Sequence, residues 1–264
     1  MKSRWRLPPA HHRPDMAASS RKRHEAAARD AASVPRITRT LTPRDAATLI
    51  LVDRSGHEPR ILMGRRRASE VFLPNKFVFP GGRLDRGDWT ATAHDTMSER
   101  DVQRLMWDMK GRASPERARA LALAAIRETF EEAGLVIGRP SASQGVPTSR
   151  HPTWRRFYRS GYLPAISRLS FLARAITPPA RPRRYDTRFF VADATEVAQE
   201  STRPDDELNT IGWFTIAEIQ TLDLPNITRA VMEDLVVHLA RGDTAAPVPF
   251  YSFRNGAFRR DLIA

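Results

Sequence analysis

The chain has no cysteine among its 264 residues. This absence excludes disulfide bonds, thiolate metal sites, iron–sulfur clusters and a cysteine nucleophile. The chain also has no apolar run of about 18 residues or more, the length that a membrane-spanning helix requires, so we expect no membrane insertion. Near the N-terminus, Pro8, Pro9, His11 and His12 stand where a signal peptide has its apolar stretch. Together these absences predict a soluble cytoplasmic protein.

Acidic residues are scarce in two segments, which carry most of the excess positive charge (net charge +13). Residues 1–45 hold eleven Lys and Arg against four acids, and residues 150–188 hold ten Arg against one acid, Asp186. Such segments attract polyanions, either nucleic acid or phosphorylated small molecules. We interpret residues 1–42 as a flexible basic arm, because they show no hydrophobic period. Residues 150–188 mix arginines with aromatics, so we expect them to be folded, with the arginines either facing an anion or packed over apolar neighbours.

Short apolar runs and turn signals predict the elements of the remaining chain. The predicted strands are residues 47–52, 60–64, 76–79, 135–137, 168–176, 188–192 and 210–214, and the predicted helices are 115–133, 216–222 and 227–240. Helix 115–133 is the best defined, because Ser114 suits its N-cap, Pro115 its first turn and Gly134 the position after its end. Its predicted core face consists of Leu123, Ile126 and Phe130. The mixture of strands and helices indicates an α/β or α+β domain.

Three carboxylates lie on one side of helix 115–133, at Glu128, Glu131 and Glu132. Like charges at this spacing repel by roughly 0.2–0.5 kcal/mol per pair, which suggests a compensating cation. Carboxylate oxygens are hard ligands that suit Mg²⁺ or Mn²⁺; the alternative is a solvated acidic helix face. Upstream, Gly81 and Gly82 end a predicted strand. We expect them to form a turn that lets the backbone approach phosphate or metal.

These residues resemble the Nudix box, G-x5-E-x7-R-E-U-x-E-E-x-G-U, in which U is apolar. Residues 127–135, with the sequence RETFEEAGL, match its second half, except that Thr129 takes the first U position. Gly82 and Asp88 match its first half, with Asp88 in place of glutamate. The family has seven residues between this acid and the arginine, whereas residues 89–126 number 38, which implies an insertion of about 31 residues.

A box divided in this way is similar to that of the Nudix branch that includes peroxisomal coenzyme A diphosphatases. Four segments of the chain resemble the same branch: residues 78–82 (VFPGG), 125–134 (AIRETFEEAG), 177–178 (TP) and 185–190 (YDTRFF). The resemblance covers about residues 45–240. It implies a Nudix-type α/β/α sandwich with a mixed central sheet over residues 43–264, following the basic arm. The helical insertion would occupy about residues 89–114, as either a substrate lid or a packing element.

The resemblance implies a hydrolase that uses water and a divalent metal, Mg²⁺ or Mn²⁺, to cleave a diphosphate bond. Carried over by position, Glu128, Glu131 and Glu132 would be metal ligands and catalytic residues. Arg127 would be a further catalytic residue that orients one of these glutamates through a charge-assisted hydrogen bond. Which acid is the general base stays open.

A further metal-binding acid from outside the box is typical of the family. We expect it among Asp205, Asp206 and Glu207, with Glu207 preferred, although a solvated acidic loop is an equal alternative. The residues expected to bind substrate are Gly81, Gly82, Arg65, Arg67 and Arg188.

The expected substrate is a phosphorylated small molecule, either coenzyme A-like or a nucleotide diphosphate. Two alternatives remain: a nucleic-acid-binding protein that uses the basic arm and the Arg-rich segment, and a Nudix module that senses a nucleotide without cleaving it. The three clustered glutamates argue against the sensing module, since a pure binder does not need them. The sequence leaves the oligomeric state open.

Overall fold

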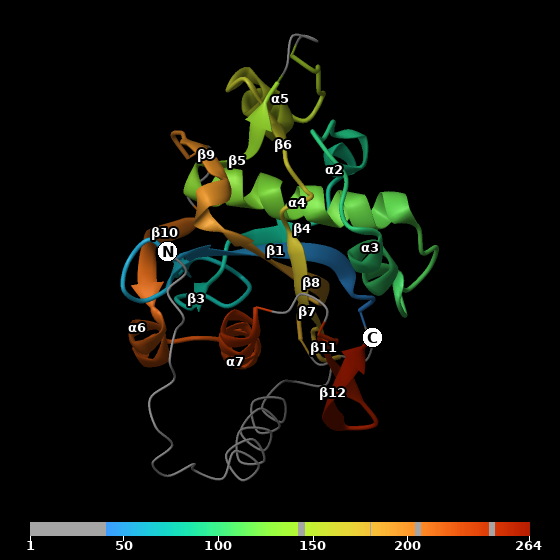
Figure 1. Cartoon of the computed structure of the whole chain (residues 1–264). Coiled ribbons are helices and arrows are strands. Elements are labelled where there is room, and N and C mark those ends of the chain that lie inside the picture. Colours follow the sequence, from blue (N-terminus) through green and yellow to red (C-terminus); the bar gives the residue numbers. More distant parts are fainter. Residues whose placement is uncertain (1–40, 142–145, 180, 204–206, 243–245) are drawn as a thin grey trace.

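A large mixed β-sheet runs through the centre of the molecule, with helices on both faces (Figure 1). The computed structural model describes residues 41–141, 146–179, 181–203, 207–242 and 246–264. Within these residues no helix is both long and apolar enough to cross a lipid bilayer. Nearly all of the predicted basic arm lies outside the described residues.

The strands of the large sheet follow the order β10-β2-β1-β8-β7-β11-β12, with β3 paired to β2 and β4 paired to β1. The pairs β1·β8 and β7·β11 are parallel and the others are antiparallel, so the sheet is mixed. The strands are β1 (Arg44–Asp53), β2 (Arg60–Arg66), β3 (Phe77–Val78), β4 (Gly81–Arg83), β7 (Ser170–Ile176), β8 (Tyr185–Asp193), β10 (Leu208–Thr215), β11 (Val248–Arg254) and β12 (Ala257–Ile263).

A long helix, α4, covers one face of this sheet, and α6 and α7 cover the other (Figure 1). The outer side of α4 is in turn covered by helix α5 and by a small sheet, β6-β5-β9. This layering confirms the predicted α/β/α arrangement. The remaining elements are α2 (Arg86–Thr90), α3 (Glu99–Met106), α4 (Pro115–Ala133), β5 (Leu135–Pro140), α5 (Pro152–Arg159), β6 (Tyr162–Pro164), η1 (Ala194–Glu196), β9 (Val197–Glu200), α6 (Ile216–Thr221) and α7 (Asn226–Arg241).

Helix α4 has the ends that the sequence predicts. The Ser114 side chain accepts a hydrogen bond from the Arg117 backbone N–H, and Pro115 occupies the first turn. Gly134 ends the helix at φ +73°, a left-handed conformation that glycine adopts without steric cost. The predicted core face is confirmed, because Leu123, Ile126 and Phe130 are fully buried. With layers on both sides, α4 is fixed in position and in rotation.

Residues 89–114 are packed into the domain. Leu105 of α3 is fully buried, and Met97 and Met109 join the same core. The buried guanidinium of Arg174 donates to two carbonyl oxygens of this segment, those of Trp107 (2.7 Å) and Asp108 (3.1 Å). These contacts join residues 89–114 to the core of the domain.

Several elements were not predicted. Strand β6 is only three residues long and β9 is largely exposed, so neither has an apolar run. The hairpin β11–β12 forms one edge of the large sheet, and β12 carries mostly exposed side chains. Helix α5 was expected only as part of a folded segment. Its buried face consists of Thr153, Trp154, Phe157 and Tyr158.

Candidate active site

Arg127, on the C-terminal half of α4, is the centre of a buried polar cluster. Its Nη1 donates to Glu128 Oε1 (2.9 Å) and to Glu131 Oε2 (2.8 Å). Its Nη2 also donates to the carbonyl oxygen of Arg83 (2.8 Å). Burial alone would lower the pKa of Arg127, but Glu128, Asp88 and Glu131 together raise it above its ordinary value. The guanidinium is therefore a fixed cation that holds two of the predicted catalytic carboxylates in place.

Asp88 holds Arg127 from the opposite side. It is fully buried, and it accepts hydrogen bonds from Arg127 Nε (2.8 Å) and Nη2 (3.0 Å), Trp154 Nε1 (2.9 Å) and the Asp85 backbone N–H (2.8 Å). A carboxylate has about four acceptor sites, so these donors occupy all of them. Asp88 therefore positions Arg127 and has no free lone pair for a metal ion.

Glu132 is buried and only partly satisfied. Its Oε2 accepts a hydrogen bond from the Gly81 backbone N–H (2.9 Å), but its buried Oε1 has no hydrogen-bond partner. Burial and the negative charges of Glu128 and Glu207 raise the pKa of Glu132 well above its ordinary value. Burial also raises the pKa of Glu128, to about 7, against the opposing effect of Arg127. This arrangement disfavours the ionised acids unless a cation is present.

The two glycines are extended in β4, so the prediction of a glycine turn is wrong. Strand β4 pairs antiparallel with β1, and neither glycine has a positive φ. Glycine is needed here for close approach. A Cβ on Gly82 would overlap the Glu128 carboxylate, and a Cβ on Gly81 would overlap Thr48. The absence of a side chain at Gly82 thus lets β4 lie directly against Glu128.

Glu207 approaches the cluster from the start of β10. Arg66 of β2 forms an ion pair with it, with 2.5 Å between Arg66 Nη2 and Glu207 Oε1. The charge of Glu207 raises the pKa of Glu132, so the two carboxylates are close enough to interact. The other two candidates for the outside acid, Asp205 and Asp206, lie outside the described residues.

Arg65 and Arg67 flank Arg66, and Arg67 lies beside Glu207. The Arg67 backbone N–H donates to the Glu207 carbonyl oxygen (3.3 Å), and Arg65 pairs with Thr210 across β2 and β10. The Arg65 guanidinium is exposed, with one hydrogen bond from its Nε to the Asn75 carbonyl oxygen (3.3 Å). Arg67 directly follows β2, and Arg65 is on β2 with Ile61 and Met63, on the face opposite Leu62 and α4.

Arg188 was predicted to bind substrate, and the structure contradicts this. Its side chain is fully buried, and Nη1 forms ion pairs with Asp45 (3.1 Å) and Asp186 (3.0 Å). Arg174 and Arg117 complete this network through Asp186 and Asp45. The reason is the two-residue period of β8, which places Arg188 on the same face as the buried core below α4.

The donor set fits a hard divalent cation. We define the acidic cluster as Glu128, Glu131, Glu132 and Glu207. Over the described part of the chain, no three His, Asp or Glu side chains already surround a common point, and Arg127 bridges two of these acids instead. The cluster nevertheless offers oxygen donors alone, one of them buried and without a partner. Carboxylate oxygens of this kind suit Mg²⁺ and Mn²⁺.

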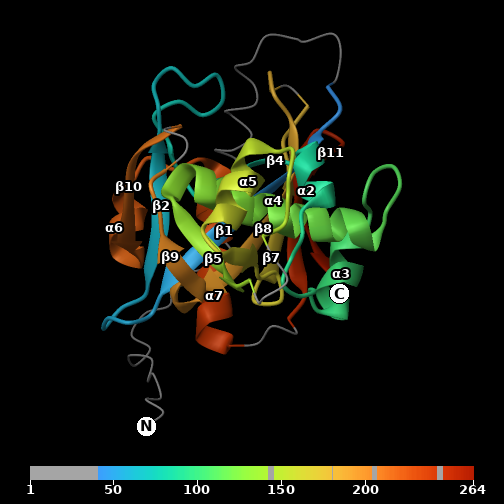
Figure 2. The same ribbon diagram turned by 90° about the horizontal axis from the view of Figure 1, so that it is seen from above.

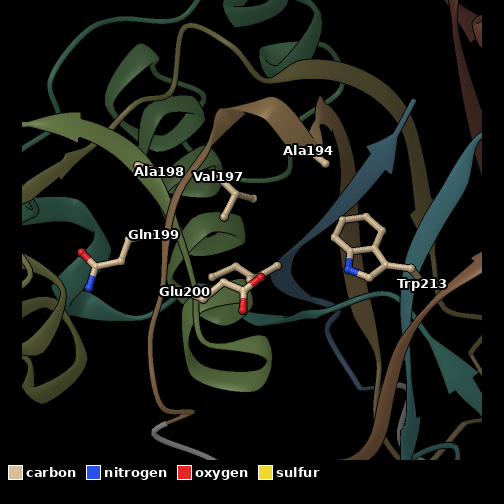
Figure 3. Close-up of a pocket in the computed structure, with 7 residues that line it drawn as sticks. Ala194, Val197, Ala198, Gln199, Glu200 and Trp213 are labelled. Atoms are coloured by element: carbon tan, nitrogen blue, oxygen red, sulfur yellow. The ribbon is translucent and has the colours of Figure 1, made fainter. Parts of the chain in front are cut away.

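A separate hollow of about 370 Å³ lies beyond the C-terminal end of α4 (Figure 3). The indole of Trp213 lies on one side of it and the β9 backbone on the other. None of the acidic cluster lines it. Its lining residues are Leu135, Ala194, Val197, Ala198, Gln199, Glu200 and Trp213.

No family model matches the chain. The chain is 24% identical to an acyl-coenzyme A diphosphatase, NUDT19, of Gallus gallus, over 60% of this chain and 54% of that protein. It thus spans about half the length of this curated relative. Among solved structures it is similar to a Nudix hydrolase from Alicyclobacillus acidocaldarius, with 25% identity and a TM-score of 0.54, covering 74% of this chain and 92% of that one.

The layered fold and the arginine–glutamate cluster at the end of α4 resemble those of the Nudix hydrolases. Among curated proteins the chain resembles a coenzyme A diphosphatase of this kind.

Sequence reasoning located Arg127 and the acidic cluster. It did not identify Thr153, whose hydroxyl donates to Glu131, or Trp154, which donates to Asp88. Both lie on α5, more than 20 residues further along the chain. No spacing pattern in the sequence links that helix to the box.

Proposed function

We propose that the chain is a divalent-metal-dependent hydrolase that cleaves a diphosphate bond by attack of water. The observation that carries this proposal is the unpartnered, buried Glu132 Oε1, beside carboxylates whose charges raise its pKa. A buried acceptor without a partner costs about 1–3 kcal/mol, and more when it is charged. A bound cation would offset this cost.

The residues of the chain supply the geometry for this reaction. Arg127 fixes Glu128 and Glu131, the Gly81 backbone N–H fixes Glu132, and Arg66 holds Glu207. Glu128, Glu131, Glu132 and Glu207 would hold the metal. Bound Mg²⁺ or Mn²⁺ would neutralise charge on the diphosphate and lower the pKa of water. Preorganised groups of this kind account for most of the rate enhancement in reactions that need no protein nucleophile.

For the substrate we propose a coenzyme A-like compound or a nucleotide diphosphate. The curated relative is an acyl-coenzyme A diphosphatase, which supports the first class. Arg67 lies beside Glu207 and would offer positive charge to the phosphates, whereas Arg65 lies on the face of β2 that carries Ile61 and Met63. At Gly82 the missing side chain lets the Glu128 carboxylate lie against the backbone of β4, so we expect this backbone to border the bound substrate.

The test is hydrolysis by the full chain, freed of metal and then given Mg²⁺ or Mn²⁺. The substrates are coenzyme A, acyl-coenzyme A, NADH, ADP-ribose, nucleoside triphosphates and capped RNA, with products identified by mass in ¹⁸O-labelled water. We expect one of the diphosphates to yield two phosphate-bearing fragments, one carrying the label. The double variant Glu131→Gln/Glu132→Gln should stay folded and lose about 100-fold or more in rate.

The matched control is Glu116→Gln, in the first turn of the same helix and exposed to solvent. Its rate should equal that of the unmodified chain. Turnover that persists in the folded double variant would contradict the assignment of the acidic cluster. Binding of RNA that survives the double variant, without hydrolysis of any compound, would favour a nucleic-acid-binding protein instead.

A further inference from the structure

Helix α5 lies across the C-terminal half of α4, directly over the residues of the box (Figures 1 and 2). The rings of Phe157 and Phe130 pack edge to face, with 5.3 Å between their centroids. Trp154 and Phe157 are fully buried, so this contact is part of the core. The N-terminal turn of α5 is thereby held at a fixed distance from Arg127 and its partners.

The first contact from α5 to the site is made by Trp154. Its indole N–H donates to Asp88 Oδ1 (2.9 Å), and the same oxygen accepts from Arg127 Nε (2.8 Å). All three side chains are at least 95% buried. This bond is one of four that Asp88 accepts, and it is the one that ties the carboxylate to α5. Through Asp88, α5 also helps to hold the Arg127 guanidinium.

The second contact is made by the neighbouring residue, Thr153. Its hydroxyl donates to Glu131 Oε1, while Glu131 Oε2 accepts from Arg127 Nη1 (2.8 Å). The two oxygens of one carboxylate are therefore held from opposite helices, α5 and α4. A carboxylate held at both oxygens has little freedom to rotate, so its remaining lone pairs keep a fixed direction.

We propose that Thr153 and Trp154 are positioning residues that fix Glu131 and, through Asp88, Arg127 in the geometry needed to bind the metal. This inference rests on the proposed function and extends it to a helix outside the box. Partners that orient metal-ligating groups typically contribute 10- to 100-fold to metal affinity or activity.

A third polar contact from the same helix provides a matched control. The Tyr158 hydroxyl accepts a hydrogen bond from the Thr92 backbone N–H (2.7 Å) and contacts no member of the acidic cluster. Tyr158→Phe therefore removes one anchor of α5 while leaving Asp88 and Glu131 with their partners. Any effect that arises only from a looser α5 should appear in this variant as well.

The experiment compares Thr153→Val, Thr153→Ser, Trp154→Phe and Tyr158→Phe in the full chain. The measurements are Mn²⁺ affinity from electron paramagnetic resonance titration, kcat and KM for the best substrate, and Tm. We expect Thr153→Val and Trp154→Phe to weaken Mn²⁺ binding and lower kcat by about 10-fold or more, with KM within about threefold. Thr153→Ser should restore both values to within about twofold. Tyr158→Phe should lower Tm alone.

The outcomes separate this inference from the proposed function. If the unmodified chain hydrolyses a diphosphate, and Thr153→Val and Trp154→Phe match Tyr158→Phe in Mn²⁺ affinity and kcat, the positioning role is refuted and the proposed function stands. If the chain binds Mn²⁺ but hydrolyses nothing, the difference in affinity among the four variants still decides the positioning role. If it does neither, both proposals are refuted.

Discussion

Glu128→Gln should stabilise the metal-free protein, and the gain should grow with pH. Burial raises the pKa of Glu128 from 4.5 to about 7. An acid whose pKa is raised by folding stabilises the folded state fully below its unfolded pKa, and this contribution is lost as pH rises through the folded value. At about 1.4 kcal/mol for each pKa unit, ionising Glu128 costs the folded protein about 3 kcal/mol by pH 8. Glutamine carries no charge and avoids this cost.

The assay is urea unfolding with a metal chelator present, at pH 5, 6, 7 and 8, for the unmodified chain and for Glu128→Gln. At pH 5 the two free energies of unfolding should be within about 1 kcal/mol of each other. At pH 8 the variant should be more stable by about 2–3 kcal/mol, or about 5–10 °C in Tm. Effects of distant titrating groups cancel in the difference between the two proteins. The pKa of the buried Glu132 is lower in the variant, because the charge of Glu128 is gone, and this adds to the gain at high pH.

Mg²⁺ should reverse the order at pH 8, since it binds the carboxylate of the unmodified chain and stabilises the folded state. The control Glu116→Gln, exposed in the first turn of α4, should gain no stability at higher pH. A stability difference for Glu128→Gln that is constant from pH 5 to pH 8 would refute this account of the cluster.

Two further substitutions test the remaining parts of the site. Gly82→Ala should lower kcat and Mn²⁺ affinity by about 10- to 100-fold, because the new Cβ would displace the Glu128 carboxylate. Gly212→Ala, where a Cβ meets only ordinary contacts, is its control, and equal kinetics for the two would contradict the steric argument. Arg188→Met should cost about 1–3 kcal/mol in the free energy of unfolding, because Asp45 and Asp186 each lose one buried partner and keep only Arg117 and Arg174. Its KM should be unchanged, and a large rise in KM at unchanged Tm would mean that Arg188 does bind substrate.

The sequence predicted those parts of the fold whose signals are local. Helix α4 was predicted to the residue because a cap, a proline, an apolar period and a terminal glycine all agree within residues 114–134. Its glutamates followed from the helical period. Arg188 was misplaced although a signal existed, because it precedes the buried Phe190 by two residues on β8 and must share its face.

Other features have no local signal. The role of Asp88 depends on the Trp154 indole, which is 66 residues further along the chain. A pair of glycines favours the prediction of a turn because glycine permits positive φ, whereas Gly82 in the structure provides the space that Glu128 needs. Both depend on which surfaces meet in three dimensions, and a single sequence does not contain that information.

The bond between Asp88 and Arg127 also explains how a divided box can keep its geometry. Asp88 directly precedes residues 89–126 and Arg127 directly follows them. Their ion pair therefore brings the two ends of this inserted segment together. In the unfolded chain, doubling the number of residues between two partners raises the entropic cost of joining them by only about 0.6 kcal/mol. Residues can therefore be added between these two partners at small entropic cost, while the acids that follow on α4 stay where they are.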